Sequence, residues 1–370
     1  MSSDDGPSAA SPPAETTSTI RTFRDALREV MREALARHPH VVILGQGVAD
    51  HKGTFGSTLG LADEFGSARI IDTPLAEEGM TGIAVGAALN GLYPIQTHIR
   101  VDFLLLALNQ ILNMAAKYRY MFGGSFEVPM LIRAVIGRSW GQGAQHSQSI
   151  QSLLAHIPGL VVLMPASAQS VLDDYPRIIS GHRGPVVSLE HRLLYDLQFR
   201  VDERRAPRDP LLGSRVARRG RDLTVVATSI MVLEALRAAE HLQREGGIDC
   251  EVIDLHCPSH PDATLIVESV ARTGRLLVAD TSWPGYGVCA EVCRLVAERS
   301  PEALRAPVVS VGLAPTPCPT AKSLEDLFYP NLRELADAMA ALATGRRDHG
   351  VPLPDERSMA DVYRRFKGPF

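Results

Sequence analysis

Short apolar runs alternate along the chain with segments whose apolar residues recur at helical spacing. In the first half, the runs expected to form buried strands are residues 41–44, 69–72, 94–99, 130–136, 161–164 and 185–189. Helical spacing marks residues 22–38, 79–90 and 103–120. Because short apolar strands joined by helices form parallel sheets covered on both faces, this half is predicted to be a doubly wound α/β domain.

The alternation returns in the second half, with strands expected at 223–227, 251–255, 276–280 and 308–311 and helices at 232–243, 263–271, 288–298 and 332–342. The prediction is therefore two doubly wound domains, residues 20–198 and 222–345. Residues 199–221 are rich in Arg, Pro and Gly, which indicates a linker that is either solvated or docks an acidic partner. Residues 1–19 are predicted to be a disordered tail and 346–370 a polar tail.

Composition narrows the class of protein. A chain of 370 residues with 45% apolar and 22% charged residues suits a globular protein of two domains. The formal net charge of −4 gives no reason to expect a nucleic acid partner. No apolar run reaches the ~18 residues that a membrane span needs, and the start of the chain does not resemble a secretory signal. The 5 cysteines are an odd number, so reduced thiols in the cytoplasm are expected.

Unusual polar residues follow the predicted strands of the first domain. Ligands of open parallel sheets bind beyond the carboxyl ends of the strands. One strand is followed by two acids and a glycine-rich helix, and another by the glycine-rich run GQGAQHSQS. The candidate residues at these positions are Glu77, Glu78, His98, Arg100, Phe103, Arg138 and His146.

Three of these segments carry a resemblance. DTPLAEEGMTGIAVGAALNGLYPI, NQILNMAAKYRYMFGG and GQGAQHSQS occur in this order. With them, residues 22–343 resemble the β subunit of the thiamine diphosphate-dependent decarboxylating component of 2-oxo acid dehydrogenase complexes, of the pyruvate and branched-chain type. VIDL, SWPGYGVCAEV and PTPCPTAKSLE match the family's second domain less closely. The resemblance implies a pyrimidine-binding domain followed by a transketolase C-terminal-like domain.

The resemblance also implies roles for four residues. Glu77 would hold the pyrimidine ring nitrogen of thiamine diphosphate, Leu75 and Phe103 would contact the same ring, and His146 would move protons at the substrate carbonyl. A histidine suits proton transfer because its pKa lies near working pH. The structural alternatives are a helix-capping acid at Glu77, a core Phe103 and a structural His146.

A motif that is missing implies a partner. Thiamine enzymes hold magnesium and diphosphate with GDG followed later by Asn, and this chain has no GDG. The resemblance therefore implies an α subunit that carries the Mg²⁺ and diphosphate motif, in an α2β2 heterotetramer that passes its acyl group to a lipoyl or acyl carrier domain.

Departures from the family pattern leave questions about the substrate. Gln46 stands where the family usually has a carboxylate, and Gln cannot relay a proton as an acid does. Arg100 replaces a small hydroxyl residue. With His98 and Arg138 it would make a cationic pocket mouth, suited to carboxylate or phosphate, unless these side chains are solvated or lie at an interface.

A metal site in the second domain has little support in the sequence. His256, Cys257 and His260 are too few, at this spacing, to predict one. No metal ligands are therefore expected on this chain, and Cys289 and Cys293 are interpreted as core residues.

Three functions remain open at this point. The first is a 2-oxo acid dehydrogenase β subunit that decarboxylates its substrate with an α partner. The second is a transketolase-like transferase that moves a two-carbon unit from a ketose phosphate to a carrier protein in specialised metabolism. The third is a non-catalytic structural subunit, against which Glu77, Phe103 and His146 argue.

Overall fold

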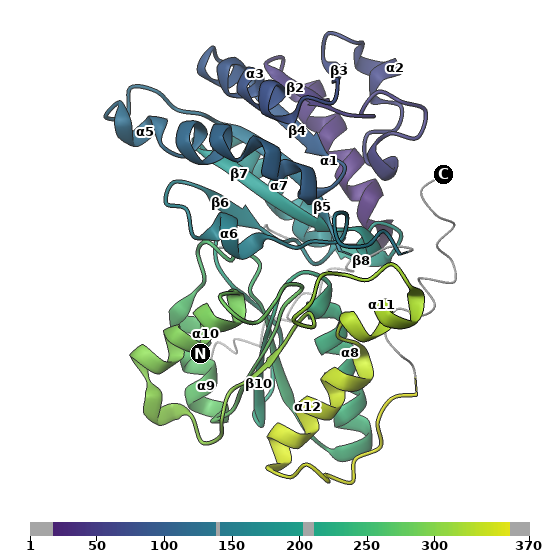
Figure 1. Cartoon of the computed structure of the whole chain (residues 1–370), viewed down its shortest axis with the longest axis vertical. Coiled ribbons are helices and arrows are strands. Elements are labelled where there is room, and N and C mark those ends of the chain that lie inside the picture. Colours follow the sequence, from purple (N-terminus) through teal and green to yellow (C-terminus); the bar gives the residue numbers. More distant parts are fainter. Residues whose placement is uncertain (1–17, 138–140, 203–210, 356–370) are drawn as a thin grey trace, which may run out of the picture.

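The structure is a computed structural model that describes residues 18–137, 141–202 and 211–355. Two α/β units lie one above the other in Figure 1, with the first half of the chain above and the second below. Each unit is built around a sheet of its own, of six and five strands, and a third sheet of two strands completes the fold.

The first sheet has the order β3-β2-β4-β5-β7-β6, and every neighbouring pair is parallel. The predicted doubly wound sheet is thus confirmed. Its strands are close to the predicted ranges: β2 (Val41–Gly45), β3 (Ile70–Asp72), β4 (Tyr93–His98), β5 (Met130–Ile136), β6 (Val161–Leu163) and β7 (Pro185–His191).

Helices cover both faces of this sheet because successive side chains of a strand point to opposite faces. In β5, Leu131 joins the apolar cluster that includes α1 and α7, whereas Ile132 joins the cluster that includes α3 and α6. The helices of this domain are α1 (Phe23–Arg37), α2 (Leu61–Phe65), α3 (Glu77–Leu89), α6 (Gln151–Ala155) and α7 (Ala168–Gly181).

The prediction of one long, regular helix over residues 103–120 is wrong. The segment consists of α4 (Val101–Leu104), a 3₁₀ turn (Leu105–Ala107), a π-helix (Asn109–Ala115) and α5 (Tyr118–Met121). In the π-helix, Gln110 is buried and its Nε2 donates to Glu78 Oε1 of α3 at 3.1 Å. The π-helix thus coincides with a contact between Gln110 and another helix. Apolar spacing alone reveals neither the π-helix nor this contact.

The second sheet has the order β13-β12-β10-β11-β9, and β9 runs antiparallel to β11 at its edge. The second domain is therefore α/β as predicted, but its sheet is mixed. The strands are β9 (Arg215–Arg218), β10 (Leu223–Ala227), β11 (Cys250–Asp254), β12 (Leu276–Ala279) and β13 (Val309–Val311). The helices are α8 (Ile230–Gly246), α9 (Ala263–Thr273), α10 (Val288–Arg299), α11 (Lys322–Phe328) and α12 (Leu332–Thr344).

Strands occur in segments where the sequence predicted none. Ser18 and Thr19, expected at the end of a disordered tail, belong to β1 (Ser18–Thr22). β1 pairs antiparallel with β8 (Gln198–Asp202), and β8 and β9 occupy the two described parts of the expected linker. The expected boundaries of the two tails and the linker otherwise stay predictions, since residues 1–17, 203–210 and 356–370 lie outside the described residues.

One apolar cluster crosses from the first domain to the second. It includes Leu27 of α1 and Ile178 of α7 together with Val225 of β10 and Leu335 of α12, all of them buried. The two domains therefore bury a shared core. Among the helices of the described residues, none is long and apolar enough to cross a bilayer.

Candidate active site

The candidate acid lies where two neighbouring strands end. Glu77 is the first residue of α3, shortly after β3, and Gln46 directly follows β2. The Gln46 amide Nε2 donates to Glu77 Oε1 at 3.1 Å. The Glu77 carboxylate thus accepts a hydrogen bond from the residue that follows β2. The N-cap residue of α3 is Ala76, so Glu77 is not the helix cap. Glu77 is half-buried.

A buried histidine lies within electrostatic reach of this acid. His98 ends β4 and is only 6% exposed. Burial lowers the pKa of His98 to about 4, and the negative charge of Glu77 opposes this shift only in part. Its Nε2 has no hydrogen-bond partner among the described residues. His98 is therefore a neutral imidazole near pH 7, with one ring nitrogen left to bind a ligand or water.

Phe103 and His146 lie together. Their ring centroids are 5.1 Å apart with an angle of 79° between the planes, an edge-to-face contact. Phe103 is 37% exposed, which leaves ring surface for a ligand. The backbone N–H of Gln148 donates to Asp102 Oδ1 at 3.2 Å, and this bond ties the loop of His146 to the helix of Phe103. Burial raises the pKa of Asp102.

The three residues predicted to contact substrate differ in their placement. Arg100 is 3% exposed, and its Nη1 donates to the carbonyl of Gly137 at the end of β5, at 3.1 Å. Burial lowers the pKa of Arg100 to about 10, against the opposing effect of Asp102. Arg138 lies outside the described residues. One guanidinium nitrogen of Arg100 thus binds a backbone carbonyl. The substrate role of His98, Arg100 and Arg138 stays a prediction.

Leu75 lies in the turn between β3 and α3 and is 82% exposed. An apolar side chain so exposed, directly ahead of Glu77, is available to a ligand or a partner chain. Its predicted contact with the cofactor stays a prediction.

Sequence reasoning missed Asp102, Gln110 and the second-domain residues that reach the loop of His146. Asp102 could have been found, since it is an acid within the apolar run VDFLLLAL. The contact between Gln110 and Glu78 depends on the π-helix, and the second-domain contacts depend on tertiary structure. No short motif reports either of them.

Two cavities help to locate the site. One of about 440 Å³ borders the loop of His146, where Ala144, Ser147 and Gln148 face Trp283 and Phe328 of the second domain. Another, of about 960 Å³, lies at the opposite edge of the first sheet, beside the amino ends of β6 and β7. Since ligands of such sheets bind at the carboxyl ends of the strands, the candidate site is the end of the sheet beside the cavity of about 440 Å³.

Within the described residues, no group of three or more His, Cys, Asp or Glu side chains is placed to hold a metal ion. His256 Nε2 lies 3.1 Å from Asp174 Oδ2, and His260 Nδ1 lies 2.9 Å from Ser259 Oγ. His260 Nδ1 also lies 3.8 Å from Cys257 Sγ, whereas the partner of His256 is Asp174.

Family models match both halves of the chain. The transketolase pyrimidine binding domain matches residues 20–198, and the transketolase C-terminal domain matches residues 213–335. A split-gene transketolase, solved as an inactive β4 tetramer, superposes with a TM-score of 0.65 at 24% identity and covers 87% of this chain and 98% of its own. A transketolase from Leishmania mexicana gives 0.64 at 17% identity, covering 92% of this chain and 48% of its own. These two likenesses show the fold, which is transketolase-like.

The sequence relatives are more specific. The pyruvate dehydrogenase E1 component subunit beta of Rhizobium meliloti is 36% identical over 338 residues, which are 91% of this chain and 73% of that protein. The mitochondrial subunit beta-1 of Arabidopsis thaliana is 39% identical over 320 residues, 86% of this chain and 88% of that protein. The chain belongs to the family of these β subunits of thiamine diphosphate-dependent 2-oxo acid dehydrogenases. The comparisons do not favour the two alternative functions.

Proposed function

We propose that this chain is the β subunit of an enzyme that decarboxylates a 2-oxo acid with thiamine diphosphate and passes the acyl group to a lipoyl carrier. The observation that carries the proposal is the arrangement of Glu77. Its carboxylate is oriented by Gln46 at the end of a parallel sheet and lies within electrostatic reach of the buried, neutral His98.

The described residues fit thiamine diphosphate. Glu77 is half-buried at the start of α3, Phe103 has exposed ring surface, and the free Nε2 of His98 indicates that a polar group is needed there. When bound, thiamine diphosphate would supply a nucleophilic carbon for reaction at the substrate carbonyl. Glu77 would hold a proton at the pyrimidine ring nitrogen, and Phe103 and Leu75 would contact the ring.

His146 would transfer protons at the substrate carbonyl. Its contact with Phe103 places it beside the proposed ring site, and the cavity of about 440 Å³ borders the same loop. A donor at this point stabilises the negative charge that develops on the carbonyl oxygen. His98, Arg100 and Arg138 remain the proposed substrate residues, and the identity of the 2-oxo acid is set by this region.

The diphosphate half of the site would come from an α subunit that also binds Mg²⁺, since the chain has no GDG motif. We propose an α2β2 heterotetramer with the cofactor between α and β. The cytoplasmic location proposed from the sequence is compatible with five cysteines that form no disulfide, although some relatives are named as mitochondrial.

The test is Glu77→Gln, which keeps the shape and removes the acid. In the complex reconstituted with the α subunit, exchange of the thiazolium proton of the cofactor should slow by roughly 10²–10⁴-fold, the range for loss of an acid–base group. Exchange is followed by proton NMR in deuterated buffer. Circular dichroism of the chain alone should be unchanged, because the half-buried carboxylate is not part of the core.

The matched control is Glu78→Gln, one residue along the same helix. Glu78 Oε1 already accepts from Gln110, so this variant should exchange the thiazolium proton at nearly the normal rate. Normal exchange in Glu77→Gln, or equal loss in both variants, would contradict the role of Glu77.

A further inference from the structure

The loop that carries His146 is held at its carboxyl-terminal end by the second domain. Ser149 Oγ lies 3.0 Å from Thr281 Oγ1, and the Ser149 carbonyl accepts from Ser282 Oγ at 2.8 Å. Gln151, with no exposed surface, donates from Nε2 to Asp280 Oδ1 at 2.7 Å. Three consecutive residues after β12 therefore contact two residues that lie just beyond His146.

Asp280 is the centre of this contact. It is fully buried, and its Oδ1 accepts from Gln151, from the hydroxyl of Thr228 and from the backbone N–H of Thr281. Its Oδ2 has no partner among the described residues. A buried acceptor with three donors is costly to remove, because each donor would lose this acceptor away from water, although Gln151 Nε2 also donates to Thr281 Oγ1 at 3.2 Å.

The amino-terminal end of the loop is also held by the second domain. The N–H of Gly141 donates to Glu325 Oε1 of α11 at 3.3 Å, and Glu325 is fully buried. Gly141 has a φ of +67°, and a Cβ there would lie 2.5 Å from the carbonyl oxygen of Thr320. The backbone of the second domain thus approaches the loop too closely for any side chain at Gly141.

We infer that the second domain positions His146, and that Asp280 is the residue on which this positioning depends. The inference rests on the proposed function of His146 in proton transfer. Second-domain contacts hold the two ends of the loop, and Asp102 holds its middle through Gln148. His146 lies between these points and against Phe103. The fixed ends restrict the backbone of the loop, so the imidazole is presented in one place.

The first test is hydrogen exchange at the amides of residues 144–149 in the full chain, alone and with its α subunit. Asp280→Ala removes the shared acceptor and should speed exchange there by roughly 10- to 100-fold, as expected when one or two buried hydrogen bonds are lost. Asp280→Asn keeps Oδ1 as an acceptor and places its amide where Oδ2 has no partner. It should restore exchange to within about threefold of the unchanged chain.

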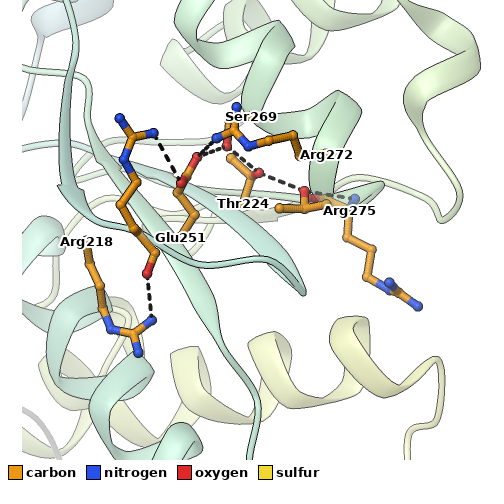
Figure 2. A network of polar contacts seen from close by, with 8 residues as sticks. Arg218, Thr224, Glu251, Ser269, Arg272 and Arg275 are labelled. Atoms are coloured by element: carbon orange, nitrogen blue, oxygen red, sulfur yellow. Dashed lines mark hydrogen bonds and ion pairs between the residues drawn. The ribbon is translucent and has the colours of Figure 1, made fainter.

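The matched control is a polar network at the other end of the same sheet (Figure 2). Thr224 Oγ1 of β10 lies 2.7 Å from Ser269 Oγ, which donates to the buried carboxylate of Glu251. Ser269→Ala also removes a buried hydrogen bond from the second domain, but far from the loop. It should lower the melting temperature without changing exchange at residues 144–149.

The second test is kinetic. In the reconstituted complex, Asp280→Ala should lower kcat by about 10-fold or more and change KM by less than about threefold, with normal activity in Asp280→Asn. If Asp280→Ala does not fold, Thr281→Val, which removes only the hydroxyl that faces Ser149 and Gln151, takes its place. It should shift exchange and kcat in the same direction.

Three results would overturn the inference: unchanged loop exchange in Asp280→Ala, an equal rise in Ser269→Ala, or a rise in exchange with no fall in kcat. A different result would contradict the proposed function without affecting this inference. If Glu77→Gln keeps its thiazolium exchange while Asp280→Ala loosens the loop, the contact between the domains stands and the cofactor role of Glu77 does not.

Discussion

At the scale of single residues, His98 is the group whose ionisation the fold changes most clearly near Glu77. Its pKa in the folded chain is about 4, against an ordinary value of 6.5. Between these values the unfolded chain binds more protons than the folded chain. Stability should therefore fall as the pH falls from about 6.5 to about 4, and above this window His98 contributes no pH dependence.

This argument gives a prediction for His98→Gln. A depression of this size corresponds to roughly 3 kcal/mol of unfolding free energy that is lost across the window. The variant should lose correspondingly less stability between pH 7 and pH 4.5, measured by urea unfolding of the full chain. His51→Gln, which changes an exposed histidine, is the control. If His98→Gln and His51→Gln show the same acid sensitivity, burial does not control the ionisation of His98.

The candidate site was partly predictable at this scale. The motif around Glu77 and the glycine-rich run before His146 indicated where the candidate site lies. The amide of Gln46, 31 residues from Glu77, could not be assigned as its hydrogen-bond donor, because that contact depends on the pairing of β2 with β3. The burial of Arg100 was equally hidden, since the same sequence would suit an exposed pocket mouth.

At the scale of elements, β5 and β7 are joined by a buried ion pair. Arg133 and Glu190 are fully buried, and two guanidinium nitrogens lie 2.8 and 2.9 Å from the two carboxylate oxygens. Tyr175 and Tyr195 also donate to Glu190, and Arg133 donates to Ser57. The Glu190 carboxylate therefore joins β5 to β7 and also accepts hydrogen bonds from two tyrosines.

Glu190→Gln should consequently be among the most destabilising conservative changes in the first domain. It leaves Arg133 charged, buried and without a counter-charge, which costs about 3–5 kcal/mol in comparable cases. Denaturant unfolding of the chain measures the loss. Glu291→Gln disrupts the exposed pair with Arg294 on α10 and should scarcely change the midpoint. A similar midpoint for both variants would contradict the structural role of the buried pair.

The elements differ in how well the sequence predicted them. The strands 130–136 and 223–227 were predicted to the residue, because a strand buried on both faces is a nearly continuous apolar run, interrupted here at Arg133 and Thr224. The partly exposed strands β1, β8 and β9 were missed, since they have no such run. The π-helix within residues 103–120 was missed because its apolar spacing also suits a regular helix.

At the scale of the whole molecule, exposed apolar side chains border the candidate site. Leu75 precedes α3, Ile83 lies on α3, and Leu106 lies on the 3₁₀ turn that packs against α3. Clusters of exposed apolar residues mark surfaces that bind other proteins. Leu75 lies two residues before Glu77, and the other two lie on or against the helix that Glu77 begins, so this surface is compatible with the proposed α subunit.

The chain alone should accordingly bind thiamine diphosphate and Mg²⁺ poorly, because we propose that the α subunit supplies the diphosphate half of the site. Isothermal titration calorimetry should show no tight binding by the isolated chain, and tight binding after addition of the α subunit. Titration of the α subunit alone controls for binding by the partner. Tight binding by the isolated chain would contradict the shared site.

The division into two α/β domains was predictable from the repeated alternation of strands and helices. Their contact was not, because the residues that join them are far apart in the chain and share no motif. Met164 donates to the carbonyl of His256, and Arg215 pairs with Asp174 at 2.6 Å. Only the folded chain brings such positions together.

The contact between Gln151 and Asp280 has a consequence for synthesis. Asp280 follows Gln151 by 129 residues, so a ribosome adding about 5–20 residues per second needs roughly 6–26 s to extend the chain from one to the other. Before that time ends every strand of the first sheet has been made, yet the loop of His146 still has none of its second-domain partners. His146, the residue proposed to transfer protons, should therefore be among the last parts of the first domain to reach its final position, after the first sheet has had time to fold.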